Sequence, residues 1–158
     1  MTKSILITGS STGIGYCAAK ILKERGYRVF ATTRKVEDVE RLQSEGFESV
    51  QLDLDDSLSI QKGLASVLAK TGGSLDFLFN NGAYGQPGAV EDLRRDVLKA
   101  QFETNVFGTQ ELTNLVIRVM REQGSGRIIY NSSILGFVAF KHRGAYVASK
   151  YAIEGLVD

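Results

Sequence analysis

The octapeptide Thr8-Gly9-Ser10-Ser11-Thr12-Gly13-Ile14-Gly15 separates a short apolar run from a segment with helical periodicity. A glycine-rich turn between a first strand and a first helix presents backbone N–H groups at a helix N-terminus, where an anionic phosphate binds favourably. In this interpretation Gly9 permits the tight turn, Gly13 leaves room for a pyrophosphate, and Gly15 lets the helix lie close to the sheet. Taken alone, such a turn is also compatible with a loop that binds no ligand.

The rest of the chain alternates short apolar runs with helical periodicities, which is typical of βαβ units around a parallel sheet. Because crossovers are right-handed, few other topologies remain. The sequence therefore predicts an α/β fold with a doubly wound parallel sheet, the Rossmann fold, with residues 1–158 as a single domain. The expected strands are residues 4–8, 27–32, 47–52, 75–79 and 127–130. The expected helices are residues 14–25, 36–45, 57–70 with Ser57 as the N-cap, 92–122, and one that begins near Gly144.

The composition is that of an ordinary globular domain, with 158 residues, 43% hydrophobic and 23% charged, and a formal net charge of +1. This balance gives no reason to expect nucleic-acid binding. Cys17 alone cannot form an internal disulfide and no apolar run could span a bilayer, so we expect a cytoplasmic protein without membrane contact. Cys17 lies on the apolar face of the first predicted helix and is expected in the core. His142, the only histidine, is expected to be solvated, and no metal site is predicted.

Further motifs follow the glycine turn in a fixed order. The turn itself has the spacing Gly-x-x-x-Gly-x-Gly, which spans one residue more than the common dinucleotide fingerprint Gly-x-Gly-x-x-Gly. Asn80-Asn81-Gly82-Ala83 follows the fourth predicted strand, and Asn105 lies within a predicted helix. Ser133 lies thirteen residues before Tyr146, which opens Tyr146-Val147-Ala148-Ser149-Lys150. With these motifs in this order, the chain resembles the short-chain dehydrogenase/reductase family, although the family's Asn-Asn-Ala-Gly has its last two small residues exchanged here.

The resemblance implies that Asn105, Ser133, Tyr146 and Lys150 are catalytic. Tyr146 and Lys150 are four residues apart on a predicted helix and so share a face; a pair with this spacing alone would more often be an exposed helical pair. A nearby ammonium favours the phenolate form of a tyrosine, which can then exchange a proton with an alkoxide or alcohol. In the family the serine polarises the carbonyl, the lysine also binds the nicotinamide ribose, and the asparagine helps to hold a water. The cofactor carries the hydride.

The second predicted strand ends in Ala31-Thr32-Thr33-Arg34-Lys35 and lacks the carboxylate that accepts the ribose hydroxyls of NAD. Arg34 offers a planar donor fork suited to a 2′-phosphate, so NADP is expected rather than NAD, unless Arg34 is an ordinary surface arginine. Asp53 resembles the family carboxylate that accepts from the adenine amino group, or it supplies helix N-terminal charge. The full expected cofactor-binding set is Gly9, Ser11, Thr12, Gly13, Ile14, Gly15, Arg34, Asp53, Asn80, Tyr146 and Lys150.

The expected function is hydride transfer between the nicotinamide and a small-molecule carbonyl or alcohol. Residues 102–108 and 131–136 resemble the branch with 17β-hydroxysteroid and retinol dehydrogenases and bacterial aldehyde reductases, which implies an apolar aldehyde, ketone, steroid or retinoid-like substrate. Family members continue past residue 158 with two further strands and the substrate-binding region. The resemblance therefore also implies a Rossmann domain truncated after the fifth strand and part of the next helix, in either a fragment or a short relative. The alternative function is a non-catalytic NAD(P)-binding module or an inactive fragment.

The resemblance further implies a homo-oligomer, because in the family the helix around the asparagine and the helix of the tyrosine pack against a second subunit. An apolar stripe in the first of these helices is wide for a helix with one buried side, and large apolar patches usually mark interfaces. The alternative is that one face of the sheet covers the whole stripe. The stripe consists of Leu112, Leu115, Val116, Val119 and Met120.

Overall fold

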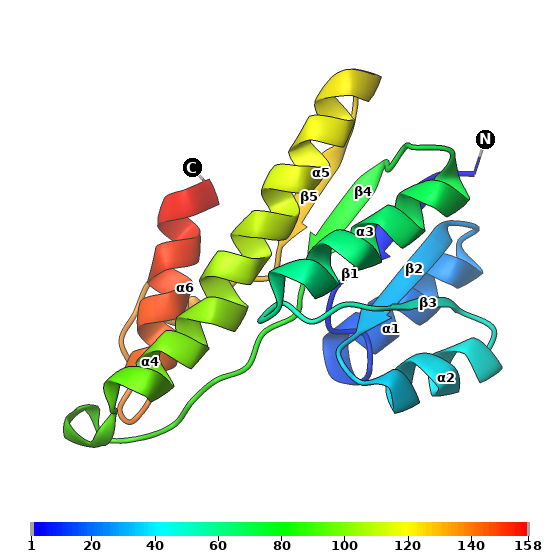
Figure 1. Ribbon diagram of the computed structural model, residues 1–158. Helices are drawn as coiled ribbons and strands as arrows, with labels where there is room; N and C mark the ends of the chain where they lie inside the picture. The colour runs from blue at the N-terminus through cyan, green and yellow to red at the C-terminus, as the bar shows by residue number, and fades with distance from the viewer. Residues whose placement is uncertain (1, 158) are drawn as a thin grey trace.

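The computed structural model describes residues 2–157 and contains one parallel sheet in the order β3-β2-β1-β4-β5 (Figure 1). The order reverses direction at β1, as a doubly wound sheet requires, so the predicted fold class is confirmed. Each strand begins and ends within two residues of its predicted position. The strands are β1 (Ser4–Ile7), β2 (Arg28–Thr33), β3 (Glu48–Gln51), β4 (Phe77–Asn80) and β5 (Arg127–Tyr130).

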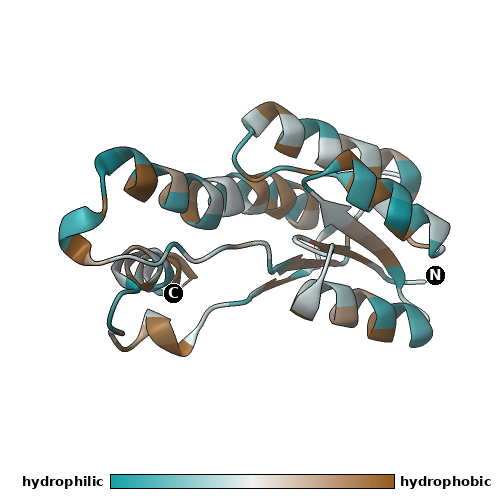
Figure 2. Cartoon of the chain, turned by 90° about the horizontal axis from the view of Figure 1, so that it is seen from below, coloured by the Kyte–Doolittle hydropathy of each residue, from teal (hydrophilic) through white to brown (hydrophobic). Residues whose placement is uncertain are grey.

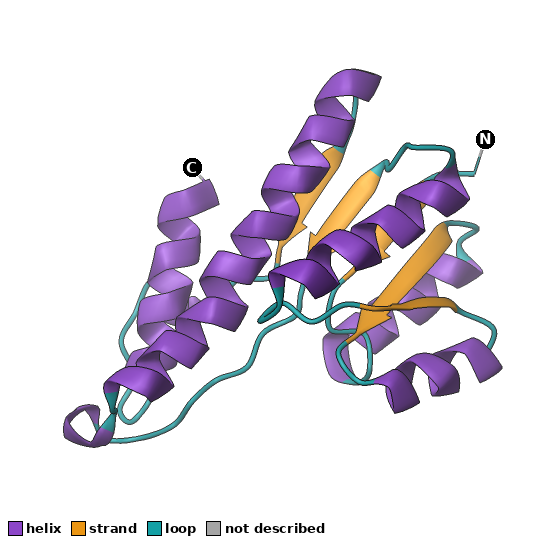
Figure 3. Ribbon diagram, viewed as in Figure 1, coloured by secondary structure: helices purple, strands orange, loops and turns teal. Residues whose placement is uncertain are grey.

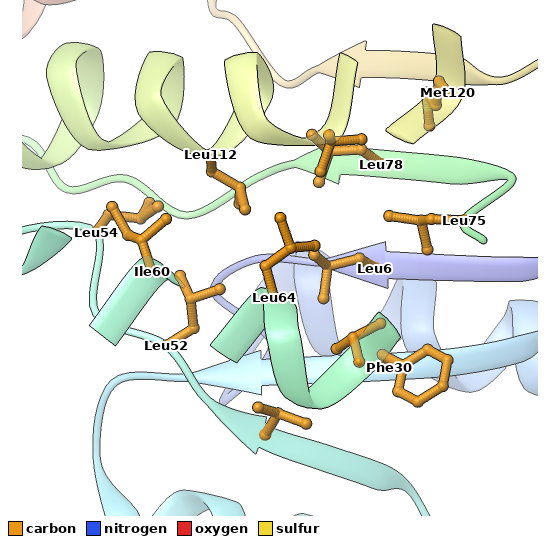
Figure 4. Close-up of a cluster of buried hydrophobic side chains, with 13 residues drawn as sticks. Leu6, Phe30, Leu52, Leu54, Ile60, Leu64, Leu75, Leu78, Leu112 and Met120 are labelled. Atoms are coloured by element: carbon orange, nitrogen blue, oxygen red, sulfur yellow. The ribbon is translucent and has the colours of Figure 1, made fainter. Parts of the chain in front are cut away.

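Helices cover both faces of the sheet, and each face has its own apolar core. Consecutive residues of β1 point to opposite faces, so Leu6 and Ile7 are both fully buried, one in each core. One core lies under α1 (Gly13–Glu24) and α2 (Val36–Ser44). The other lies under α3 (Ser57–Thr71) and α5 (Thr109–Gln123), where leucine side chains from both helices meet the strands (Figure 4). In Figure 2 the strands are mostly brown while the helices carry teal segments on their outer sides.

The first helix uses a different face from the one that its apolar residues predict. Cys17 is exposed, and Ile14 and Ile21 are 64% and 47% exposed. The buried positions are Gly15 and Ala19. The expectation that Cys17 lies in the core was wrong, because α1 packs through Gly15 and Ala19, with Leu22 partly buried against the core, while Ile14, Cys17 and Ile21 turn outward.

The predicted long helix at residues 92–122 consists of several elements. A single turn, η1 (Val90–Asp92), precedes α4 (Arg95–Phe102), and a π-helical segment, η2 (Glu103–Gly108), joins α4 to α5. The extra residue per turn brings Gly108 against the backbone of Leu54, where a Cβ atom would collide with the Leu54 carbonyl. Single π-helical turns within a helix are rare and often lie at functional sites. Hydrophobic periodicity does not distinguish them from an α-helix.

The apolar stripe of α5 mostly faces the sheet. Leu112, Val116 and Met120 are buried in the core, and Leu115 packs against it in part. The stripe therefore gives less support to self-association than its sequence suggests, and a homo-oligomer stays a prediction. The last helix, α6 (Gly144–Val157), lies beside α4, η2 and the short turn η3 (Ile134–Gly136). No helix within residues 2–157 is long and apolar enough to cross a bilayer.

Helix α3 is capped by Asp56 and not by Ser57. The Asp56 carboxylate accepts hydrogen bonds from the backbone N–H groups of Leu58 at 2.9 Å and Ser59 at 3.2 Å. The Ser57 hydroxyl donates instead to the carboxylate of Glu111. The prediction was wrong by one residue because adjacent aspartate and serine residues are both good N-caps, and only the backbone geometry selects between them.

The replacement Asp56→Ala should lower the free energy of unfolding by about 1 kcal/mol, the usual cost of an N-cap. Urea unfolding followed by circular dichroism measures the change. The control Ser57→Ala removes a hydroxyl that caps nothing and should cost clearly less. A larger loss for Ser57→Ala than for Asp56→Ala would contradict this assignment.

Candidate functional site

Two adjoining cavities open at the carboxyl ends of the strands, beside the point where the strand order reverses. This position is where open α/β sheets bind their ligands. The large cavity has a volume of about 810 Å³ and the small one about 210 Å³. Both are lined by Gly9, Ser11, Gly82, Ala83 and Tyr84, so they are neighbouring parts of one depression. The large cavity extends to the segment after β5 and to α6, and the small one extends to the ends of β2 and β3.

The glycine turn after β1 is packed against the turn after β4. Gly9 has φ +66°, and a Cβ atom there would lie 2.7 Å from the Cα of Gly82. A Cβ atom at Gly15 would collide with the Gly9 carbonyl and the Asn81 side chain. Gly15 therefore brings α1 close to the turn itself, whereas the sequence predicted close packing on the sheet. Gly13 also has positive φ, and nothing lies within 4 Å of its Cβ position, so its backbone is open to a ligand.

Asn81 joins the two turns. Its amide nitrogen donates to the carbonyls of Thr8 at 3.0 Å and Gly9 at 3.2 Å, and its amide oxygen accepts from the side chain of Asn131 at 2.9 Å. Asn81 also lines the large cavity. The sequence analysis selected its neighbour Asn80, whose amide donates to Thr113 on α5 at 2.8 Å and which lines neither cavity. Of this pair, the structure brings Asn81 to the cavity.

Lys150 is buried at the floor of the large cavity. It is only 5% exposed, and its ammonium donates a hydrogen bond of 2.7 Å to the carbonyl of Asn131. Burial lowers the pKa of Lys150 below its ordinary value, and the nearby carboxylate of Glu154 acts in the opposite direction. The Lys150 Nζ atom lies 5.6 Å from the centre of the Tyr146 ring. The predicted helical spacing thus places the two side chains next to each other.

Ser133 and Tyr146 line the same cavity as Lys150. The Ser133 hydroxyl oxygen accepts a hydrogen bond from the N–H of Leu135 at 3.2 Å, which orients the side chain and leaves its proton available for donation. Tyr146 comes from the first turn of α6, and Ser133 from the segment just after β5. The structure therefore brings together three of the four residues that the sequence selected as catalytic.

The fourth, Asn105, lies behind the cavity and does not line it. It is 3% exposed, and its side-chain amide is fully engaged. The amide oxygen accepts from the N–H of Tyr84 at 3.1 Å, and the amide nitrogen donates to the Tyr84 carbonyl at 2.9 Å and to Ser149 at 3.0 Å. Asn105 thus holds the loop after β4 and the residue that precedes Lys150.

Arg34 and Asp53 line the small cavity, next to the glycine turn. Arg34 is exposed, and its backbone carbonyl accepts from the side chain of Gln51 at 3.0 Å. A second cation, Arg41, donates to the carbonyl of Ser11 at 2.6 Å and was not selected from the sequence. The packing of α2 against its neighbours sets which side of this helix faces the glycine turn, and this brings Arg41 to the turn. No group of His, Cys, Asp and Glu side chains that could hold a metal ion occurs among residues 2–157.

Comparison with known proteins agrees with this arrangement. The family model of short-chain dehydrogenases matches residues 3–158. The chain is 42% identical over its whole length to the uncharacterized oxidoreductase YbbO of Escherichia coli, of which it covers 59%. It is 35% identical over 96% of its length to a 3-ketodihydrosphingosine reductase of Bacteroides thetaiotaomicron, of which it covers 54%.

A solved structure of actinorhodin polyketide ketoreductase with NADPH superposes with a TM-score of 0.90 at 30% identity, over 98% of this chain and 62% of that one. The fold, the arrangement of the site and these matches agree on one protein family. The chain belongs to the short-chain dehydrogenase family and spans just over half the length of the curated relatives that it matches.

The replacement Gly15→Ala should destabilise the protein, because the new methyl group has no room between Gly9 and Asn81. Overpacking of this kind costs about 1–3 kcal/mol in the free energy of unfolding. Denaturant unfolding measures it, with Gly155→Ala as the control, since nothing lies within 4 Å of that Cβ position on α6. Equal stability of the two variants would contradict the tight packing of the turn.

Proposed function

We propose that this protein is an NADP(H)-dependent oxidoreductase that interconverts a carbonyl compound and its alcohol. The observation that carries the proposal is the convergence of Ser133, Tyr146 and the buried Lys150 on a cavity that continues to the glycine turn. A spacing in the sequence could arise by chance, but it would not also place a proton donor, a hydrogen-bond donor and a cation on one cavity wall.

The residues of the two cavities fit a dinucleotide. The open backbone at Gly13 and the start of α1 suit a pyrophosphate, which the helix N-terminus attracts. Ile14 is 64% exposed and lines the large cavity, where it would contact the cofactor. The free fork of Arg34 at the small cavity suits a 2′-phosphate, and Asp53 on the same cavity suits the adenine amino group. Lys150 would reach the nicotinamide ribose from the cavity floor.

When bound, the cofactor supplies the hydride to the carbonyl carbon or accepts it from the alcohol. The Ser133 hydroxyl donates a hydrogen bond to the carbonyl oxygen and polarises it. As the carbon–oxygen π bond opens to an alkoxide, Tyr146 gives its hydroxyl proton to that oxygen, and in the reverse direction it removes the proton. The Lys150 ammonium, held by the Asn131 carbonyl, stabilises the phenolate that Tyr146 becomes. Asn105 holds the helix that carries Lys150 and the loop at Tyr84 in a fixed position relative to each other.

An apolar carbonyl compound is the substrate class that the cavity supports best. Beyond Ser133 and Tyr146 its lining includes the apolar residues Ile134, Leu135 and Phe140, together with Arg143. Ile134 and Phe140 are 76% and 64% exposed, so their apolar surface is available to a ligand. A similar protein that carries the name 3-ketodihydrosphingosine reductase acts, by that name, on a long-chain ketone. An aldehyde or ketone with a hydrocarbon chain is therefore the first substrate to test.

The alternative is a nucleotide-binding module without catalysis. A panel of aliphatic aldehydes, ketones and a steroid ketone, incubated with NADPH and the complete gene product, separates the two functions. Oxidation of NADPH that depends on the carbonyl compound supports the enzyme. Tight NADPH binding without turnover of any member supports the module.

The replacement Tyr146→Phe should reduce turnover by at least about 100-fold, because it removes the proton donor, a role worth about 10²–10⁴-fold. Binding of NADPH, measured by its fluorescence, should change little. The matched control is Tyr151→Phe, which removes a hydroxyl from an exposed position of the same helix and should keep full activity. Wild-type turnover in Tyr146→Phe would refute the proposed role.

The replacement Arg34→Ala should weaken the binding of NADPH by at least about tenfold and that of NADH much less. Charge-assisted hydrogen bonds contribute about 1.5–3 kcal/mol, and only NADPH has the 2′-phosphate. Isothermal titration of both cofactors measures the difference. Arg118→Ala on the exposed side of α5 is the control for a lost positive charge. Equal affinity of the unmodified protein for the two cofactors would argue against NADP.

A further inference from the structure

Gln101, in the last turn of α4, is a fully buried polar side chain that the proposed mechanism does not use. Its amide oxygen accepts a hydrogen bond from the N–H of Gln86 at 2.8 Å. Its amide nitrogen donates to the carbonyl of Tyr84, also at 2.8 Å. Because both ends of the amide have partners, its burial is tolerated, and removal of the amide would leave backbone groups without partners.

Gln101 acts on the same stretch of chain as Asn105, which lies four residues later. Asn105 binds both the N–H and the carbonyl of Tyr84, and Gln101 binds the same carbonyl and the N–H of Gln86. This stretch is neither helix nor strand, and Figure 3 shows it as part of the long loop that runs from β4 to η1. The two side-chain amides thus pair the loop backbone in the way that a neighbouring strand would.

The clamped loop lies against the ring of Tyr146. A Cβ atom at Gly85, between the two clamped residues, would be 3.3 Å from Cδ2 and 3.4 Å from Cγ of that ring. Further along the loop, the N–H of Gly88 donates to the carbonyl of His142 at 3.1 Å, just before α6. The loop backbone therefore forms one wall of the space that the Tyr146 ring occupies.

We propose that Gln101 is a positioning residue: its amide holds the Gly85 backbone against the Tyr146 ring and so fixes where the Tyr146 hydroxyl lies in the large cavity. The inference rests on the proposed function for its effect on turnover. Displacement of a reacting group by about 1 Å can reduce a rate by about 100-fold, so a loop shift of this size is sufficient to lower turnover. The effect should fall on the chemical step, because Gln101 lines neither cavity.

The chain supplies a matched control in Gln123. Its amide nitrogen donates to the Leu75 carbonyl at 2.7 Å and also to the Ser125 carbonyl, and its amide oxygen accepts from the Leu75 N–H at 3.1 Å. Gln123 thus clamps a loop in the same manner, but at the end of α5 near the start of β4, away from both cavities. Replacement by leucine removes the hydrogen bonds of the side-chain amide to backbone groups at either position, two at Gln101 and three at Gln123, and keeps a similar volume.

In the complete gene product, Gln101→Leu should lower kcat at least tenfold while the Kd for NADPH changes less than threefold. Gln123→Leu should keep kcat within twofold, even where the two variants are equally destabilised in urea. A kcat for Gln101→Leu that matches that of Gln123→Leu at equal folded fraction would overturn the inference.

The replacement Gln101→Glu adds a pH signature that a purely structural role would not give. A protonated carboxyl can donate to the Tyr84 carbonyl and accept from Gln86, as glutamine does, whereas a carboxylate only accepts. Burial raises the pKa of a carboxyl group, so the protonated form should persist to mildly acidic pH. The kcat of Gln101→Glu relative to wild type should therefore rise as the pH falls. A ratio that is independent of pH would count against the clamp.

Two spectroscopic readouts separate this inference from the proposed function. The proposed function fails if the complete gene product reduces no carbonyl compound, or if Tyr146→Phe turns over as fast as wild type. The clamp is then judged by amide hydrogen exchange at Tyr84 and Gln86 and by the NMR signal of the Tyr146 ring. Both should change in Gln101→Leu and remain unchanged in Gln123→Leu. An unchanged Tyr146 signal in Gln101→Leu would refute the positioning role.

Discussion

The contact on which the rest of this structure depends is the backbone-to-backbone packing of the turn after β1 on the turn after β4. Gly9 and Gly82 approach so closely that a Cβ atom at Gly9 would lie 2.7 Å from the Cα of Gly82. The Thr8 hydroxyl accepts from the N–H groups of Asn81 and Gly82 at 3.0 and 2.8 Å and fixes the approach. Because β1 and β4 are adjacent and parallel, both turns emerge at the same edge of the sheet. The cavity at this edge follows from that packing.

From this contact a row of hydrogen bonds crosses three strand ends to Lys150. The Asn81 side chain binds the glycine turn on one side and Asn131, after β5, on the other. The Asn131 carbonyl in turn accepts from Lys150. The cation that we propose to assist proton transfer is thereby linked to the turn that would hold the phosphates. Such a network also explains how a lysine remains at a 5% exposed position, since a buried charge needs partners.

The sequence was sufficient for the sheet, its order of elements and most of the site, because each depends on short-range patterns. Strand ends in a parallel sheet share one edge, so Ser133 after β5 and the glycine turn after β1 could be placed together before any coordinates. The patterns failed where tertiary packing decides. Cys17 sits at an apolar helical position, but α1 needed glycine and alanine against its neighbours. Which of the two adjacent asparagines lines the cavity depends on how the chain leaves β4, and in this structure it is Asn81 and not Asn80.

The same difference between short-range patterns and tertiary packing explains why the sequence indicated Asn105 but not Gln101. Asn105 belongs to a motif with a fixed distance to other motifs, whereas nothing local separates Gln101 from a surface glutamine. Its burial arises because α4 continues through a π-helical segment into α5, which sets the rotation of α4 about its axis. Both amides then point to one side and meet the backbone of the loop after β4. A residue can therefore be important for the geometry of a site although nothing in its local sequence indicates such a role. This is the case when the residue binds backbone groups that would otherwise lack a hydrogen-bond partner.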